Sequence, residues 1–145
     1  YFIDLYDYFD QLCQKRDHHL NIELPDESLP HIHVDKDRLT QILSILIDNA
    51  ISYSPKDSLI TIRPYAKRST FQIEVEDHGI GILQNHQEHI FDRFYRVDRS
   101  RNDKSHFGLG LSVARELIEL QGGSITLKDT PNGGATFVIG VPLRY

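Results

Sequence analysis

The sequence has 145 residues, the usual length of one folded domain, so we expect a single domain over residues 1–145. Apolar side chains make up 39% and charged ones 26%, which is a globular composition and excludes a disordered chain. Twenty-one acidic residues against 16 basic ones give a net charge of −5, which argues against binding to nucleic acid or to an anionic membrane.

The N-terminal third predicts two helices with a short strand between them. Apolar side chains over residues 2–13 recur at spacings of three and one, which is typical of a helix with one buried stripe. Residues 20–24 alternate apolar and polar up to a proline and predict a strand. A second helix is expected over about 36–54, capped by Asp35 or Asp37.

The remaining chain predicts a sheet. Strands are expected at about 59–65, 70–77, 124–128 and 135–142, with a helix at about 109–121. The glycine-containing, charged stretch between 79 and 107 is long for a connection inside a compact domain and indicates a functional lid or disorder. These elements predict an α/β fold: a two-layer sandwich with a mixed, mostly antiparallel sheet and helices on one face.

Asp77 places a carboxylate where the strand pattern predicts an apolar residue. Side chains alternate along a strand, so three apolar residues share its face: Phe71, Ile73 and Val75. A buried carboxylate is costly unless it is hydrogen-bonded, and Gly79 and Gly81 let the backbone approach it closely. Asp77 is therefore either a ligand-binding carboxylate or an Asp that caps its own turn.

Two further features fit a ligand site at the edge of the core. Asn49 lies at the border of the apolar arc of the helix 36–54, where it can reach a ligand or metal, or bond to neighbouring backbone. The run Phe-Gly-Leu-Gly-Leu at 107–111 precedes a helix, whose free N–H groups favour phosphate. A dinucleotide fingerprint fails because Val113 occupies the third glycine position, and a simple tight turn stays the alternative.

Five motifs, in chain order, resemble the ATP-binding catalytic domain of bacterial two-component sensor histidine kinases, of the HATPase or GHKL family. Residues 46–50 resemble its N box, 77–81 the first glycine box, 91–96 the F box, 108–111 the second glycine box and 133–137 the final turn and strand. The resemblance covers nearly the whole chain and implies the Bergerat ATP-binding fold.

The resemblance implies ATP and Mg²⁺ as cofactors and a role for each site residue. Asp77 would accept a hydrogen bond from the adenine amino group, Asn49 would coordinate Mg²⁺, and Asn49 and Arg96 would be the catalytic residues. Arg96 would offer a guanidinium to the phosphates, whose transition state spreads negative charge over the γ-oxygens. The other implied nucleotide contacts are Tyr53, Gly79, Gly81, Ile82, Tyr95, Arg101, Gly108, Leu109, Gly110 and Leu111.

The implied enzyme is a protein-histidine kinase. It would transfer the γ-phosphoryl group of ATP to a His on a dimerisation domain that is not in this sequence, and a response regulator receiver domain would be a further partner. Residues about 80–107 would form a mobile ATP lid, which Phe91 and Phe94 would anchor on the domain body. The full-length protein would be a membrane-anchored homodimer with this domain in the cytoplasm.

The sequence departs from the family pattern on both sides of Asn49. Many members carry a second Asn one helical turn earlier, where this chain has Ile45, and a Lys three residues later, where it has Ser52. Both changes remove phosphate-side contacts and predict weak Mg·ATP affinity or compensation from the lid. Strand alternation also points Ala135 inward, so the hydroxyl often found near adenine is absent.

One other function stays open beside the kinase, and a second is disfavoured. A decayed N box would leave a regulatory nucleotide-binding module without efficient phosphotransfer. An ATPase of the gyrase or chaperone type would need a carboxylate one turn before Asn49, which Ile45 removes. The eight histidines match neither a phosphoacceptor motif nor a metal site, so we expect them to be exposed or structural.

Three smaller features bear on the cellular setting. A lone Cys13 cannot form an internal disulfide and fits a reducing compartment. No apolar run approaches the roughly 18 residues of a membrane span. The sequence does not begin with Met, so we expect a piece of a longer protein.

Overall fold

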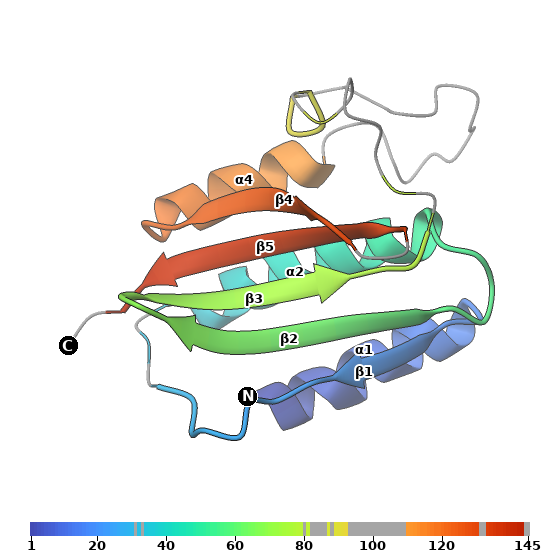
Figure 1. Cartoon of the computed structure of the whole chain (residues 1–145), viewed down its shortest axis with the longest axis horizontal. Coiled ribbons are helices and arrows are strands. Elements are labelled where there is room, and N and C mark those ends of the chain that lie inside the picture. The colour runs from blue at the N-terminus through green and yellow to red at the C-terminus, as the bar shows by residue number, and fades with distance from the viewer. Residues whose placement is uncertain are drawn as a thin grey trace.

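The computed structural model of the chain describes residues 1–30, 32, 34–79, 81, 87, 89–92, 110–130 and 133–143. In chain order its elements are α1 (Phe2–Lys15), β1 (His19–Ile22), α2 (Lys36–Ser52), β2 (Leu59–Lys67), β3 (Thr70–Glu76), α4 (Gly110–Leu120), β4 (Ser124–Asp129) and β5 (Ala135–Pro142). The strands form one sheet in the order β1-β2-β3-β5-β4 (Figure 1). None of the described helices combines the length and the apolar composition that crossing a membrane requires.

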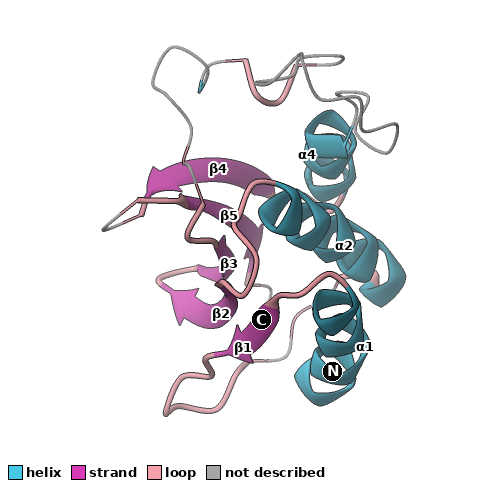
Figure 2. Ribbon diagram, turned by 90° about the vertical axis from the view of Figure 1, so that its right-hand side faces the viewer, coloured by secondary structure: helices cyan, strands magenta, loops and turns pink. Residues whose placement is uncertain are grey.

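The sheet is mixed, and the described helices lie on one of its faces. β1 pairs with β2 in parallel, whereas the other neighbours pair antiparallel. Figure 2 shows α1, α2 and α4 on the same side of the sheet. The expected two-layer α/β sandwich is therefore confirmed, and its core lies between the helices and the sheet.

α1 buries a narrow stripe against β1 and α2. Its buried side chains, Leu5, Phe9 and Cys13, are four residues apart and so lie on one face of the helix. Burial raises the pKa of the Cys13 thiol to about 11, so the thiol stays protonated at neutral pH.

β1 is shorter than the alternation predicts. It ends at Ile22, and Leu24 lies beyond it with 54% of its surface exposed, so the expected strand through residue 24 is wrong at its end. The backbone N–H of Glu23 still donates to Ile62 O at 2.9 Å, but Pro25 has no N–H to extend the ladder. The apolar character of Leu24 therefore reflects no strand pairing.

α2 begins with a side-chain cap and is the crossover helix that connects the parallel strands β1 and β2. Oδ1 of Asp35 accepts hydrogen bonds from the backbone N–H groups of Asp37 and Arg38, at 3.0 and 3.2 Å. The helix ends at Ser52, two residues earlier than expected, with Tyr53 as its C-cap. Its core face is formed by Leu39, Ile42, Leu43, Leu46, Ile47, Ala50 and Ile51.

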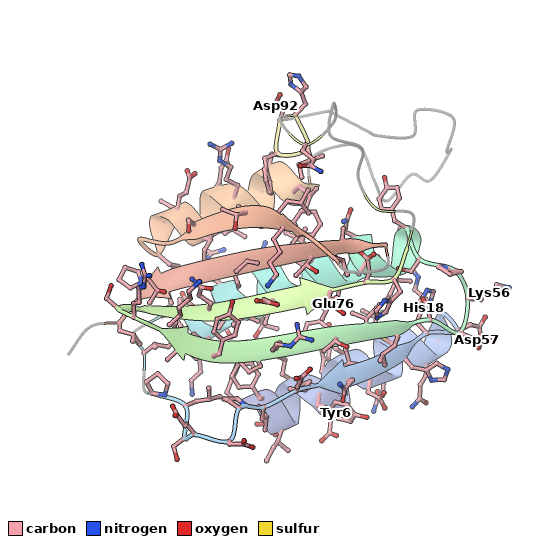
Figure 3. The ribbon with its side chains drawn as sticks, in the orientation of Figure 1. Tyr6, His18, Lys56, Asp57, Glu76 and Asp92 are labelled. Atoms are coloured by element: carbon pink, nitrogen blue, oxygen red, sulfur yellow. The ribbon has the colours of Figure 1, made fainter. Side chains whose placement is uncertain are left out.

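The helix-free face of the sheet carries a buried carboxylate, Glu74. Only 3% of Glu74 is exposed. Glu76, two residues further along β3 and therefore on the same face, lies on the open face turned to the viewer in Figure 3. Arg63 Nη1 donates to Glu74 Oε1 at 2.9 Å, Lys128 Nζ donates to Oε2 at 3.0 Å, and the Tyr65 hydroxyl also donates to Oε2. Burial alone would raise the pKa of Glu74, but these donors outweigh it and hold the pKa below its usual value.

Replacing Arg63 with Met should leave the buried Glu74 with one charged donor fewer. We expect the free energy of unfolding at about pH 7 to fall by about 1–3 kcal/mol, the usual loss when a buried group keeps its charge and loses a partner. A lowered pKa stabilises the fold above the unfolded-state value, and this stabilisation is lost as pH falls through the folded pKa. The deficit measured by urea unfolding should therefore shrink in acid.

Arg115 supplies the matched control for this substitution. Its Nε donates to Glu119 Oε1 at 3.0 Å, but both side chains are more than half exposed. Arg115→Met should change the free energy of unfolding by no more than about 0.5 kcal/mol. Equal losses in the two variants would contradict a special role for burial at Glu74.

Candidate functional site

Asp77 follows β3 directly and turns its carboxylate into the core side of the sheet. Only 3% of the residue is exposed. Its Oδ1 accepts hydrogen bonds from the backbone N–H groups of Gly79 at 2.9 Å and Ala135 at 3.1 Å. Within the described part of the chain, Oδ2 accepts no hydrogen bond. One oxygen is thus fixed by backbone, and the other keeps its acceptor capacity.

The electrostatics of Asp77 are those of an incompletely satisfied acceptor. Burial raises the pKa of the carboxyl, and the two backbone amides offset this only in part, so the pKa lies above its usual value. A buried carboxylate in this state costs folding free energy until a further donor reaches it. Such perturbed groups cluster at functional sites.

Glycines bring three backbone segments together around this carboxylate. A Cβ added to Gly79 would lie 2.0 Å from the carbonyl oxygen of Tyr53, at the end of α2. A Cβ on Gly134 would lie 2.1 Å from the carbonyl oxygen of Asp77. Gly81 has φ +74°, in the left-handed region that favours glycine. The ends of α2 and β3 and the start of β5 therefore meet without intervening side chains.

Asn49 lies in the last turns of α2 and is partly exposed. Its backbone carbonyl accepts a hydrogen bond from the N–H of Tyr53 at 3.2 Å. No hydrogen bond to its side-chain amide is made by the described residues, so the alternative of an Asn bonded to neighbouring backbone finds no support there. The amide is available to a ligand.

Ile45 joins α2 to the first turn of α4. It is partly buried, and a Cβ on Gly110 would lie 3.5 Å from its Cγ2 atom. Helical spacing places Ile45 outside the apolar arc of α2, and it does escape the full burial of Ile42 and Ile47. It nevertheless packs against the core, so it serves as an interhelical contact beside Asn49.

Apart from Asn49 in α2, the described site residues fall into two groups. Asp77, Gly79, Gly81 and Tyr53 gather at the ends of α2 and β3, whereas Gly110 and Leu111 form the first turn of α4 against Ile45. Outside the described residues lie the remaining expected site positions and a lid anchor: Ile82, Phe94, Tyr95, Arg96, Arg101, Gly108 and Leu109.

Two expectations around this site are confirmed. The ring of Phe91 packs edge-to-face on Phe137, with centroids 6.1 Å apart, so it does contact the domain body. Ala135 is buried on the core face, as the strand alternation predicts. The hydroxyl of the next residue, Thr136, instead lies 2.6 Å from the hydroxyl of Thr130.

Two side chains from the α1–β1 turn contact the end of α2, and no sequence pattern indicates these contacts. Arg16 donates to Asp48 and Ser52. The ring of buried His18 lies between two carbonyl oxygens, with Nδ1 2.7 Å from Arg16 O and Nε2 3.3 Å from Ser54 O. Except for the contact of His18 with the Arg16 carbonyl, each contact joins residues more than 30 positions apart in the sequence. No local pattern could therefore reveal them.

The described part of the chain holds no metal site built from protein side chains alone. Among the residues that the structure describes, no three His, Cys, Asp or Glu side chains group so that they could hold a metal ion. Any ion near Asn49 would need most of its ligands from elsewhere.

Comparison with known proteins agrees with this architecture. The family model for histidine kinase-, DNA gyrase B- and HSP90-like ATPases matches residues 34–145. The signal transduction histidine-protein kinase ArlS of Staphylococcus aureus (strain USA300) is 43% identical over 124 residues, which are 85% of this chain and 27% of ArlS. The chain thus spans about a quarter of the length of that relative.

Solved histidine kinase structures share the fold. The nucleotide-free catalytic domain of the histidine kinase ThkA superposes with a TM-score of 0.81 at 27% identity, over 97% of this chain and 88% of that one. ThkA in complex with the response regulator protein TrrA gives a TM-score of 0.79 at 26% identity, over 99% and 39% of the two chains. With the family model covering most of its length, the chain belongs to the histidine kinase-, DNA gyrase B- and HSP90-like ATPase family.

Proposed function

We propose that this domain binds Mg·ATP and transfers the γ-phosphoryl group to a histidine of a dimerisation domain in the same protein. The observation that carries the proposal is the Asp77 carboxylate, buried with Oδ1 held by two backbone amides and Oδ2 open to a donor. The exocyclic amino group of adenine is such a donor. A charge-assisted hydrogen bond to it would offset the desolvation of the carboxylate.

The backbone around Asp77 suits a flat heteroaromatic ring. Gly79 and Gly134 have no room for a Cβ, so neither of these two positions puts a side chain between the carboxylate and a ligand. Gly81 extends the same turn in a left-handed conformation. Specificity for adenine would then rest on one carboxylate in a wall otherwise made of backbone.

The phosphate side of the site fits Mg²⁺ held mainly by the nucleotide. Mg²⁺ keeps several waters and takes one or two protein ligands together with substrate phosphates, so the single amide oxygen of Asn49 is a sufficient protein donor. When bound, the ion would neutralise charge on the phosphates. The N-terminus of α4 at Gly110 would direct backbone N–H groups towards them, and Arg96 and Arg101 would add guanidinium groups.

The kinase is the best supported of the functions that these residues permit. ArlS and ThkA are histidine kinases by name, and the chain superposes on the catalytic domain of ThkA. A gyrase- or chaperone-type ATPase would need a carboxylate where Ile45 instead packs on α4. We propose residues about 80–107 as the ATP lid of a single domain, and a response regulator as the downstream partner, as ThkA pairs with TrrA. The full-length protein would be a membrane-anchored homodimer with this domain in the cytoplasm.

Replacing Asp77 with Asn should weaken Mg·ATP binding by at least about tenfold, because the charge-assisted acceptor becomes an amide that can present its NH₂ group to adenine. Isothermal titration with Mg·ATP and Mg·ADP measures the loss. Glu119→Gln, on the exposed side of α4, should leave the affinity unchanged. Unchanged affinity in the Asp77 variant would remove that residue from the site.

Phosphotransfer to a supplied dimerisation domain tests the reaction itself. We expect the wild-type domain to phosphorylate the acceptor His in the presence of Mg·ATP. Nucleotide binding without transfer would instead favour a regulatory nucleotide-binding module.

Relative to the wild type, the Asp77→Asn variant should become more stable as pH rises. Because the folded pKa of Asp77 is raised, the wild-type fold loses stability from about pH 4 upwards through that pKa, whereas Asn cannot ionise. The difference in free energy of unfolding, variant minus wild type, should therefore increase from acid to neutral pH in urea titrations. Glu74→Gln should show the opposite trend, because the pKa of Glu74 is lowered. Parallel trends in the two variants would refute the assignment.

A further inference from the structure

Arg16 extends from the end of α1 to the last turns of α2. Its Nη1 donates to Oδ1 of Asp48, and its Nη2 lies 3.3 Å from the hydroxyl of Ser52. The Arg16 side chain is 35% exposed, so it is not enclosed by the protein. The side chain is thus ordered by two contacts without being enclosed.

The backbone of the α1–β1 turn holds Arg16 in this position. The N–H of His18 donates to Cys13 O at 2.8 Å, and its ring contacts the carbonyl oxygens of Arg16 and Ser54. The N–H of Asp57 donates to Asp17 O at 2.7 Å. Figure 3 shows His18 and Asp57 at the same end of the molecule. The turn is therefore fastened to the chain that follows α2.

The guanidinium lies within one helical turn of Asn49. Asp48 precedes Asn49, and Ser52 is three residues after it, a spacing that makes side chains neighbours on a helix surface. Of the Lys and Arg side chains in the described ranges, Arg16 is the one that bonds to this part of α2, since Arg38 bonds to Gln41 in the first half. It brings positive charge to the side of the site where phosphates would lie.

We propose that Arg16 is a nucleotide-binding residue that contacts the terminal phosphates of ATP. This inference rests on the proposed function, because it places adenine at Asp77 and the phosphates beside Asn49. Arg presents five N–H donors in a planar fork that matches phosphate oxygens, and Asp48 and Ser52 engage two of its nitrogens here. On nucleotide binding the guanidinium would exchange the Asp48 carboxylate for phosphate oxygens.

The contact with Asp48 gives this proposal a signature that a structural ion pair lacks. If Arg16 binds phosphate, Asp48 competes with the nucleotide for the guanidinium, so removal of each partner should change affinity in opposite directions. If the pair only holds α1 against α2, either variant loses the same contact. The melting temperature would then fall in both variants, and the effect would not depend on the phosphates of the ligand.

The test compares ligands with and without phosphates on the whole chain. Isothermal titration with Mg·ATP and with adenosine is carried out on wild type, Arg16→Met and Asp48→Asn, with Arg115→Met as the matched control. Arg16→Met should weaken the affinity for Mg·ATP by about tenfold and keep the affinity for adenosine within about twofold of the wild type. Asp48→Asn should tighten Mg·ATP binding, and Arg115→Met should change neither ligand.

A double variant separates charge from packing. Arg16→Met with Ser52→Lys returns a cation to the same turn of α2 and should recover most of the Mg·ATP affinity, whatever happens to the melting temperature. Equal losses for both ligands in Arg16→Met, or no loss for either, would overturn the inference, as would a double variant that fails to recover. Asp77→Asn should weaken the binding of both ligands. If the wild type binds neither Mg·ATP nor adenosine, the proposed function is overturned as well. If only the affinity of Arg16→Met is unaltered, this inference alone is overturned.

Discussion

The buried carboxylate of Asp77, at the end of β3, constrains the path of the backbone around it. Asp77 is almost fully removed from solvent, so it needs donors, and it takes them from the backbone of Gly79 and Ala135. Reaching both amides requires the chain to pass closer to Tyr53 and to Asp77 itself than any side chain would allow. The glycines at 79 and 134 follow from this constraint, and so does the meeting of α2, β3 and β5 at one point.

Two buried carboxylates, Glu74 in β3 and Asp77 directly after it, are stabilised to different extents. Glu74, on the helix-free face, receives donors from Arg63, Tyr65 and Lys128, and its pKa is lowered. Asp77, on the core face, receives two backbone amides from the described residues, and its pKa is raised. The first is satisfied within the protein and stabilises the sheet. Asp77 can accept a further hydrogen bond, which a ligand can donate, and this is the pattern expected of a binding group.

Local periodicity was enough to predict most elements and the inward position of Asp77, because alternation and helical spacing act within a few residues. The motif order likewise led to the contact of Phe91 with the domain body. The burial of Glu74 could not be predicted, since alternation assigns it to the open face and its donors come from β2 and β4. The contacts of Arg16 are equally hidden, because the α1–β1 turn meets α2 only after the sheet has formed.

β3 and β5 are neighbours in the sheet although residues 77–134 separate them along the chain. The entropy of closing a long loop grows only with the logarithm of its length, about 0.6 kcal/mol for each doubling. Insertions and deletions between β3 and α4 that leave the site residues in place should therefore cost little closure entropy. The β2–β3 hairpin is the opposite case, because Lys67 pairs with Thr70 across a two-residue turn in which Arg68 has φ +57°. One inserted residue there would shift the register of two central strands, so length variation among relatives should concentrate in the first connection and avoid the second.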